Sequence, residues 1–297
     1  MGGSGKTPLV AAIARLLVQM GERPAILSRG YKRRYRSDDV VVVSDGKSVL
    51  TDVDHAGDEP FMLARAVPDA AVLVCATRYR AGQVAETRLG CTVHLLDDGF
   101  QHFELARNLD LLIVTGADCA NPYPLPLGRL REPFSAVAAA DALFVSTRDT
   151  AVAVENRPTF HMERTIEAPR EIPEDLRADT GEQTSLAIPG PVFAMAGIAN
   201  PHRFFDDLQR AGWHLVGTRM FADHYRFSMM DITDVLSAAQ SAGAKAVLTT
   251  EKDLARLSGL PRFPTPDSGI PILWTPLRVM LDPTFAPWLR ENLARAS

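Results

Sequence analysis

The amino-acid sequence predicts an α/β fold in which a parallel-sheet domain is followed by a second, smaller α/β domain. Short apolar, β-rich segments alternate with helical patterns, and this alternation stops near residue 157 and resumes near residue 191. Buried strands that alternate with helices pair in parallel and are covered by those helices on both faces. We therefore predict domains at 1–156 and 191–297, with an extended linker at 157–190.

The first domain opens with a predicted helix over Pro8–Met20, where apolar residues recur every three or four positions and Gly21 follows. A second helix is predicted from Pro60 to Ala66, since proline suits the first helical turn. The buried strands predicted in this domain are Ala25–Ser28, Val40–Val43, Ala71–Cys75, Thr92–Leu96, Leu109–Val114 and Ala142–Val145.

The second domain shows the same alternation of strands and helices, after a linker with a different amino-acid composition. Thr159–Ile166 alternates polar and apolar residues and is predicted as an exposed extended segment, and residues 167–190 are rich in Pro, Glu, Asp and Thr. The stretch near 272–282 is a candidate for a second linker strand that returns beside the first. The elements predicted beyond the linker are Val192–Ala196, Pro201–Ala211, Leu215–Arg219, Ile232–Ala242, Ala246–Thr249 and Ile270–Trp274.

The composition excludes several classes of protein. The 297 residues are 46% hydrophobic and 23% charged, and the net charge is −4. These values are ordinary for a folded globular protein, and they supply no overall positive charge to attract nucleic acid. No apolar run reaches the roughly 18 residues that a membrane-spanning helix needs. We therefore expect no nucleic-acid partner and no membrane span.

A glycine-rich segment at the start ends as Gly-Lys-Thr where the first helix begins, which is the second half of a phosphate-binding P-loop. Lys6 is predicted to reach the β and γ phosphates and Thr7 to hold Mg²⁺. The alternative is a flexible glycine-rich terminus. Such a loop normally follows a buried strand, so we expect the first strand of this P-loop NTPase-like domain to be missing from the sequence. The nucleotide-binding residues predicted here are Gly2, Gly3, Ser4, Gly5, Lys6 and Thr7.

Two carboxylates, Asp97 and Asp98, follow the strand predicted at Thr92–Leu96. The carboxyl end of a buried strand is where P-loop enzymes hold Mg²⁺. The alternative is a simple turn at Asp98-Gly99, because Asp-Gly pairs favour turns. Beside a phosphate loop, we predict a metal role for at least one of the two.

Several further motifs span nearly the whole chain. They are Ser28-Arg29-Gly30-Tyr31, Gly57-Asp58-Glu59-Pro60, Asp97-Asp98-Gly99-Phe100-Gln101-His102, Leu105-Ala106-Arg107-Asn108-Leu109-Asp110, Pro126-Leu127-Gly128-Arg129-Leu130-Arg131-Glu132-Pro133, Gly197-Ile198-Ala199-Asn200-Pro201, Asp223-His224-Tyr225 and Thr250-Glu251-Lys252-Asp253. With these motifs in this order, the chain resembles the tetraacyldisaccharide 4'-kinases, the lipid A 4'-kinase family. Compared with that family, the phosphate loop has Ser4 at a position where Thr is also common, and Asn108 stands where Asp is common.

The resemblance implies an activity and a location. The activity is ATP- and Mg²⁺-dependent phosphorylation of the 4' hydroxyl of a tetraacylated glucosamine disaccharide 1-phosphate, in lipid A and lipopolysaccharide biosynthesis. The location is the cytoplasmic face of the inner membrane, as a peripheral protein on an anionic surface. Family members usually begin with a hydrophobic segment that this sequence lacks. The resemblance also implies two α/β domains joined by a two-stranded linker.

The resemblance also assigns catalytic roles to residues of these motifs. Asp58 is the expected base that accepts the proton of the sugar hydroxyl, although its place before Pro60 also suits a helix cap. His224 is expected to orient Asp58 or to raise its basicity from the other domain, so that catalysis depends on domain closure. The alternative for His224 is a structural role in its turn. Arg131 is expected to stabilise the transferring phosphoryl group, and Glu132 to bind Mg²⁺ or a cation. The alternative for Arg131 and Glu132 is a surface ion pair.

Further residues are predicted to contact the ligands. Gln101 and His102 follow the metal aspartates closely and are expected near the phosphates. Glu59 and Arg78 are expected at the substrate, although Arg78 is equally well explained as a solvated side chain. A basic run is interpreted either as a contact for anionic lipid headgroups or the substrate's 1-phosphate, or as a solvated loop. It comprises Lys32, Arg33, Arg34 and Arg36.

Two other functions share the phosphate loop. A P-loop nucleotide switch or assembly factor would use Lys6 and Asp97 without needing Asp58 and His224 to meet. A degenerate P-loop protein would bind nucleotide weakly. Transfer of labelled phosphate from ATP to the acylated disaccharide distinguishes a kinase from both.

Overall fold

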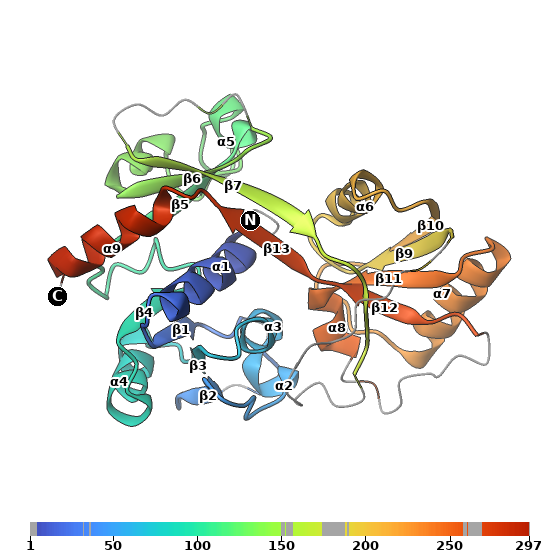
Figure 1. Ribbon diagram of the computed structural model, residues 1–297, viewed down its shortest axis with the longest axis horizontal. Helices are drawn as coiled ribbons and strands as arrows, with labels where there is room; N and C mark the ends of the chain where they lie inside the picture. Colours follow the sequence, from blue (N-terminus) through green and yellow to red (C-terminus); the bar gives the residue numbers. More distant parts are fainter. Residues whose placement is uncertain are drawn as a thin grey trace. The chain divides into compact units, whose positions relative to one another are not determined.

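The chain is described from a computed structural model that covers residues 5–31, 33–35, 37–149, 152, 157–173, 188, 190–257, 260 and 269–296 (Figure 1). It divides into two compact units. The first unit comprises Met1–Ala12, Asp97–Arg164 and Val279–Ser297, and the second comprises Ile13–Leu96 and Thr165–Arg278. The domain division expected from the sequence, 1–156, 157–190 and 191–297, remains a proposal. No helix in the described ranges has both the length and the apolar content needed to cross a bilayer.

One sheet of the second unit is built around a fully buried strand, β1 (Pro24–Ser28). This strand pairs in parallel with β3 (Ala71–Val74) and β4 (Val93–Leu96), whereas the edge strand β2 (Val41–Asp45) is antiparallel to β3. An antiparallel edge strand on a parallel sheet is common in α/β proteins. The predicted strands are therefore confirmed, and the direction of β2 is the one departure from a parallel sheet.

Helices of this part of the chain follow the strands as predicted, with two additions. Helix α1 (Lys6–Gln19) is the helix expected after the glycine-rich segment. Helix α2 (Val53–Ala56) is short, and α3 (Asp58–Ala66) begins two residues before Pro60. Helix α4 (Arg78–Leu89) was not predicted, because it has few large apolar residues and presents only Arg78, Ala81, Gly82 and Ala85 as buried residues.

The second sheet of this unit has the order β10-β9-β11-β12-β8. Strands β9 (Val192–Ala196), β10 (Leu215–Met220), β11 (Ala246–Thr250) and β12 (Ile272–Thr275) run parallel, and the short β8 (Arg170–Glu171) is antiparallel at the edge. Separate apolar clusters form from buried residues of β9 with α6 (Pro201–Arg210) and with α7 (Met229–Ser241). Helix α8 (Glu251–Leu257) directly follows β11.

The sheet of the first unit has the order β13-β7-β6-β5. Strands β5 (Leu111–Val114), β6 (Ala142–Ser146) and β7 (Thr159–Ile166) are parallel, with α5 (Gly116–Ala120) and the 3₁₀ helix Phe134–Ala139 between β5 and β6. Strand β13 (Leu277–Leu281) lies next to β7, as the candidate second linker strand requires. Helix α9 (Phe285–Ala296), which was not predicted, ends the chain.

An aromatic cluster anchors α9 to this sheet. Phe285 is fully buried, and its ring lies 4.8 Å from Phe144 and 5.1 Å from Phe160 between ring centroids. Edge-to-face contacts of this kind add to the free energy of burying the rings. The cluster therefore makes α9 part of the core of the first unit.

We expect Phe285→Ala to lower the free energy of unfolding by about 3–5 kcal/mol, because it removes a buried ring and leaves a cavity. Urea or thermal unfolding followed by circular dichroism measures this. Met280→Ala is the matched control, since that side chain is largely exposed and its loss should change stability by no more than about 0.5 kcal/mol. Equal effects of the two substitutions would show that α9 does not pack as described.

Candidate active site

The phosphate loop meets helix α1 at Gly5, whose φ of 92° is a conformation that side-chain-bearing residues rarely adopt. Lys6 is the first residue of the helix and Thr7 the second, so both stand at the end where backbone amides and the helix dipole favour an anion. Gly2, Gly3 and Ser4 lie outside the described residues. The part of the predicted nucleotide site that the structure describes is therefore a glycine turn that leads into the N-terminus of a helix, and its role in binding nucleotide remains a proposal.

Asp98 connects this loop to the end of β4. It adopts a left-handed conformation with a φ of 56°, and its carboxylate accepts from Lys6 Nζ at 2.8 Å and from Arg131 Nη1 at 2.9 Å. Burial alone would raise the pKa of this carboxyl, but the hydrogen bonds and charges of Lys6 and Arg131 lower it below its usual range. Asp98 is thus held ionised at the phosphate loop. The alternative that Arg131 pairs with Glu132 at the surface is not what the structure shows.

The neighbours of Asp98 complete this group, which we call the loop cluster: Lys6, Asp98, Gln101 and Arg131. Gln101 accepts a second hydrogen bond from Arg131 Nη1, at 3.3 Å. His102 is half-buried and closes a tight turn by donating its backbone N–H to the Gly99 carbonyl at 2.9 Å. The structure therefore brings four sequence-predicted residues together at one end of α1.

The loop cluster suits Mg²⁺ that is held mainly by a nucleotide. Within the ranges that the structure describes, no three or more His, Cys, Asp or Glu side chains gather as a ready-made metal cage. Mg²⁺ usually binds through one or two carboxylates together with substrate phosphates and water. Asp98 lies at the phosphate loop and Asp97 next to it is buried, so the acidic donors fit that requirement. The proposed ligand set remains Thr7, Asp97, Asp98 and Glu132.

A second cluster forms around Asp58, the first residue of α3. Gly57, not Asp58, is the N-cap of this helix, so the alternative that Asp58 serves as the cap is wrong. Its Oδ2 atom lies 2.8 Å from His224 Nδ1 and 2.7 Å from Arg256 Nε. An ionised carboxylate can only accept, so His224 Nδ1 carries the hydrogen. All three residues belong to the second compact unit.

The Asp58 carboxyl is strongly acidic. Burial would raise its pKa, but the hydrogen bond from His224 and the charge and hydrogen bond of Arg256 lower the pKa to about 2. The expectation that His224 raises the basicity of Asp58 is therefore wrong, because its hydrogen bond stabilises the ionised form. His224 has a φ of 61°, which for a residue with a bulky side chain marks a constrained turn. The turn thus directs His224 toward Asp58. We call Asp58, His224 and Arg256 the carboxylate cluster.

Arg256 was missed by the sequence analysis. Its side chain is only 4% exposed, and its Nη1 atom donates to Asp253 Oδ1 at 3.0 Å. Asp253 is itself fully buried and accepts from the Gly197 N–H at 3.1 Å and the Thr250 hydroxyl at 2.7 Å. The available signal was spacing, since Arg256 lies three residues after the motif residue Asp253 and so on the same face of α8.

The remaining predicted residues have other surroundings. Glu59, the residue after Asp58, forms an ion pair with Lys252 at 2.7 Å. Arg78 is buried at the start of α4 and donates to the Ala76 carbonyl at 3.0 Å, so the solvated alternative for it is wrong. Substrate roles for Glu59 and Arg78 remain proposals.

The basic run is not a uniformly solvated patch. Arg33 is buried and donates to the Ser37 carbonyl, and Arg34 pairs with Asp54 at 3.5 Å. Lys32 and Arg36 lie outside the described residues. Arg33 and Arg34 therefore stabilise the loop that contains them.

Comparisons with known proteins agree with this geometry. The model of the tetraacyldisaccharide-1-P 4'-kinase (LpxK) family matches residues 1–294. A tetraacyldisaccharide 4'-kinase from Anaeromyxobacter sp. is 42% identical over 271 residues, covering 87% of this chain and 71% of that protein. Another, from Geobacter sulfurreducens, is 38% identical over 294 residues, covering 95% of this chain and 80% of that protein.

A solved structure confirms the fold. The crystal structure described as the "apo" form of LpxK from Aquifex aeolicus in complex with ATP has a TM-score of 0.77 and 30% sequence identity to this chain. The match covers 99% of this chain and 85% of that one. The α/β fold, the family motifs and the family-wide match agree, and the chain belongs to the tetraacyldisaccharide-1-P 4'-kinase family.

Proposed function

We propose that this chain transfers the γ-phosphate of ATP to the 4' hydroxyl of a tetraacylated glucosamine disaccharide 1-phosphate, a step of lipid A biosynthesis. Family membership supports this activity. The observation that carries the chemistry is the ionised Asp58 carboxylate bonded to His224. A nucleotide switch has no use for that pair, because it hydrolyses or exchanges nucleotide and binds no sugar hydroxyl.

The loop cluster supplies the phosphate side of the reaction. Lys6 and Arg131 would contact the β and γ phosphates and the charge that develops on the transferring group. Thr7 and Asp97 or Asp98, with Glu132 as a further ligand, would hold Mg²⁺, which would supply neutralisation of the phosphate charge. The backbone amides of Gly2, Gly3, Ser4 and Gly5, with Gln101 and His102, would position the phosphates.

The carboxylate cluster supplies the hydroxyl side. A carboxylate with a pKa of about 2 is a weak base for removing a hydroxyl proton early. Phosphoryl transfer passes through a loose transition state in which the hydroxyl loses its proton late. Asp58 would therefore orient the hydroxyl first and accept its proton as the new bond forms, with the imidazole of His224 holding the carboxylate in place.

Transfer requires the phosphate held by one cluster and the hydroxyl oriented by the other to meet. The two clusters belong to different compact units. A dependence of catalysis on domain closure remains a proposal, while Asp58 and His224 pair within one unit. Glu59 and Arg78 are proposed to contact the substrate.

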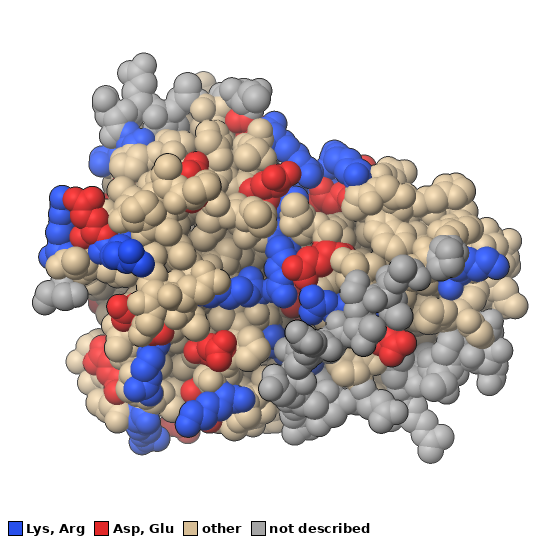
Figure 2. All heavy atoms as spheres, in the orientation of Figure 1, with Lys and Arg blue, Asp and Glu red and all other residues tan. Residues whose placement is uncertain are grey.

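We propose peripheral attachment to the cytoplasmic face of the inner membrane through an apolar loop of the first unit. Leu125 and Leu127 are 56% and 81% exposed. Two backbone hydrogen bonds close the loop, from Leu125 N–H to the Leu130 carbonyl and from Gly128 N–H to the Pro124 carbonyl, both at 2.9 Å. On the face in Figure 2, acidic and basic side chains are interspersed, and the proposal rests on the two exposed leucines.

Phosphate transfer from labelled ATP to the acylated disaccharide 1-phosphate tests the function. We expect Asp58→Asn to lower kcat by about 10²–10⁴, the usual contribution of a positioned proton acceptor, with little change in the KM for ATP. Asp54→Asn is the matched control, because that carboxylate is nearby in sequence and pairs with Arg34. Wild-type protein without transfer would refute the kinase proposal, whereas an active Asp58→Asn variant would refute only the role of Asp58.

The pKa of Asp58 predicts a dependence of stability on pH. Because its folded pKa is depressed, the ion pairs add stability that is complete above about pH 5 and is lost as the pH falls through 3.8 toward 2. The full contribution is about 2 kcal/mol. We expect Arg256→Gln to raise the pKa of Asp58 toward 3.8 and so to flatten this loss, which urea unfolding between pH 5 and 3 measures.

Two controls accompany that experiment. Asp58→Asn removes the titrating group and should show the flattest profile, whereas Arg256→Lys keeps a cation beside Asp58 and should recover part of the slope. A positioning role for Arg256 also predicts a fall in kcat that Arg256→Lys partly rescues. Identical slopes for wild type and Arg256→Gln would show that Arg256 does not set the acidity of Asp58.

Sedimentation with phosphatidylglycerol–phosphatidylethanolamine vesicles tests the membrane loop. Burying one leucine stabilises by about 1.5–3 kcal/mol, so Leu125→Ser with Leu127→Ser should weaken vesicle binding by at least roughly tenfold. Met230→Ser is the control, since Met230 is exposed on α7, in the other unit. Unchanged sedimentation of the double variant would exclude this loop as the anchor.

A further inference from the structure

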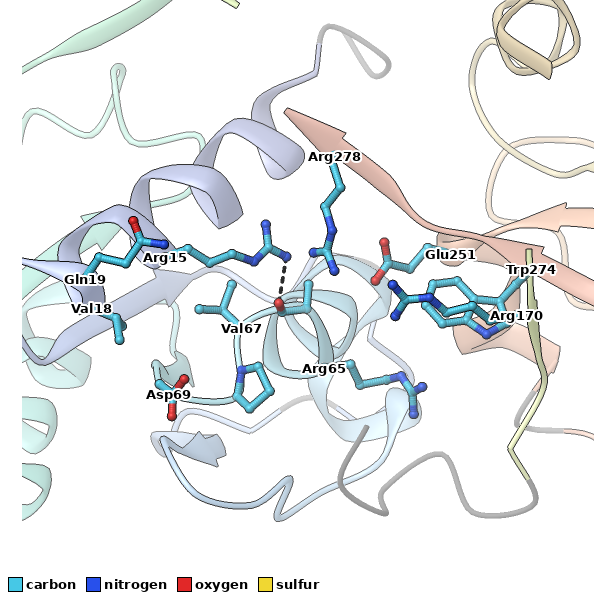
Figure 3. A pocket seen from close by; sticks show the side chains of 12 residues that line it. Arg15, Val18, Gln19, Arg65, Val67, Asp69, Arg170, Glu251, Trp274 and Arg278 are labelled. Carbon is cyan, nitrogen blue, oxygen red and sulfur yellow. Dashed lines mark hydrogen bonds between the residues drawn. The ribbon is translucent and has the colours of Figure 1, made fainter. Parts of the chain in front are cut away.

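A cavity of about 380 Å³ lies within the second compact unit, apart from both clusters described above. Its walls come from α1, α3, β8, α8, β12 and the start of β13, segments far apart in the sequence (Figure 3). Small-molecule sites in proteins typically have about 300–1,000 Å³. None of the residues that line this cavity belongs to the loop cluster or to the carboxylate cluster.

The lining is rich in guanidinium groups. Arg15, Arg65, Arg170 and Arg278 line the cavity together with only two carboxylates, those of Asp69 and Glu251. A third carboxylate, Glu167, accepts from Arg170 at 2.8 Å and from Arg278 at 2.9 Å. Even with Glu167 included, the positive charges outnumber the negative ones.

The guanidinium groups are held in place before any ligand binds. Arg15 Nη2 donates to the Ala66 carbonyl at 2.7 Å, and the guanidinium of Arg170 lies 5.6 Å from the ring centroid of Trp274. Figure 3 shows the side chains of Arg15 and Arg278 directed toward one another, with the Glu251 carboxylate near Arg278. Such fixed side chains lose little conformational entropy when they bind an anion.

The pKa of Arg15 is lowered to about 10, mainly by burial and, to a smaller extent, by the neighbouring charge of Arg278, against the weaker opposing effects of Glu251 and Glu167. A guanidinium normally keeps its proton far above that pH. An added anion would relieve the mutual repulsion of Arg15 and Arg278.

We propose that this cavity binds a compact oligophosphate anion through Arg15, Arg170 and Arg278. Arginine presents a planar fork of donors that matches phosphate oxygens, and several such groups converge only where a multiply charged ligand is bound or a charge network is built. The ligand is either free oligophosphate or the phosphate groups of a nucleotide. Both share this chemistry, and the site is separate from the phosphate loop.

Isothermal titration with inorganic pyrophosphate and with ADP tests the proposal, using the full chain carrying Lys6→Ala to weaken the phosphate loop. We expect saturable binding that persists in Lys6→Ala and weakens by about tenfold for each guanidinium removed, in Arg15→Gln and in Arg278→Gln. Tighter binding of pyrophosphate assigns free oligophosphate as the ligand, and tighter binding of ADP assigns a nucleotide.

Two further variants keep the test informative if the arginine variants unfold. Asp69 is exposed at the rim of the cavity, so Asp69→Asn should leave folding intact and tighten pyrophosphate binding by about twofold, because it removes a repelling charge. Arg295→Gln removes a surface guanidinium of α9 and should have no effect. Absence of pyrophosphate binding in Lys6→Ala, or binding that is indifferent to Arg15→Gln, Arg278→Gln and Asp69→Asn, would overturn the proposal.

Discussion

The buried ion pair between Asp58 and Arg256 is the interaction on which the proposed chemistry depends. A lone carboxylate at this depth would favour its protonated form and could not accept a proton. Arg256 prevents this because it is itself fixed on its other side by Asp253, which the Thr250 hydroxyl and the Gly197 N–H hold. The strand ends of β9 and β11 therefore determine the state of a carboxylate on α3.

The loop cluster and the carboxylate cluster each keep a partly buried carboxylate ionised, and they do so in the same way. Asp58 lies between His224 and Arg256, and Asp98 lies between Lys6 and Arg131, so each carboxylate is kept ionised by two partners. Such groups can position charge without first being deprotonated. This suits phosphoryl transfer, where the protein contributes mainly orientation and charge neutralisation.

Much of the fold could be predicted from the sequence, because buried strands and amphipathic helices have clear periodicities. The extended segment Thr159–Ile166 was predicted with the observed bounds of β7. Its prediction as exposed was wrong for one face, because Phe160 and Met162 pack into the core. The direction of β2 could not be predicted, since a short apolar run looks the same in parallel and antiparallel pairs. Helix α4 was missed for a related reason: its buried face is made of Arg78 and small residues, which give no apolar stripe.

The candidate site was predicted less evenly. Asp58 and His224 are 166 positions apart, and only the family motifs linked them. Arg256 lies outside any quoted motif, and a buried arginine cannot be distinguished from an exposed one by residue type alone. Its role follows from tertiary packing, in which α3 and α8 place Asp58 and Arg256 within hydrogen-bonding distance.

The acidity of Asp58 also distinguishes between mechanisms. A base that removes the proton before transfer needs a pKa near the working pH, and the hydrogen bond of His224 together with Arg256 opposes that by holding the pKa of Asp58 at about 2. An acceptor that takes the proton late needs only to be ionised and correctly placed, and Arg256 favours both. Burying Arg256 and Asp253 costs free energy. A loose transition state explains that cost, because it requires the Asp58 carboxylate to be ionised and correctly positioned rather than strongly basic.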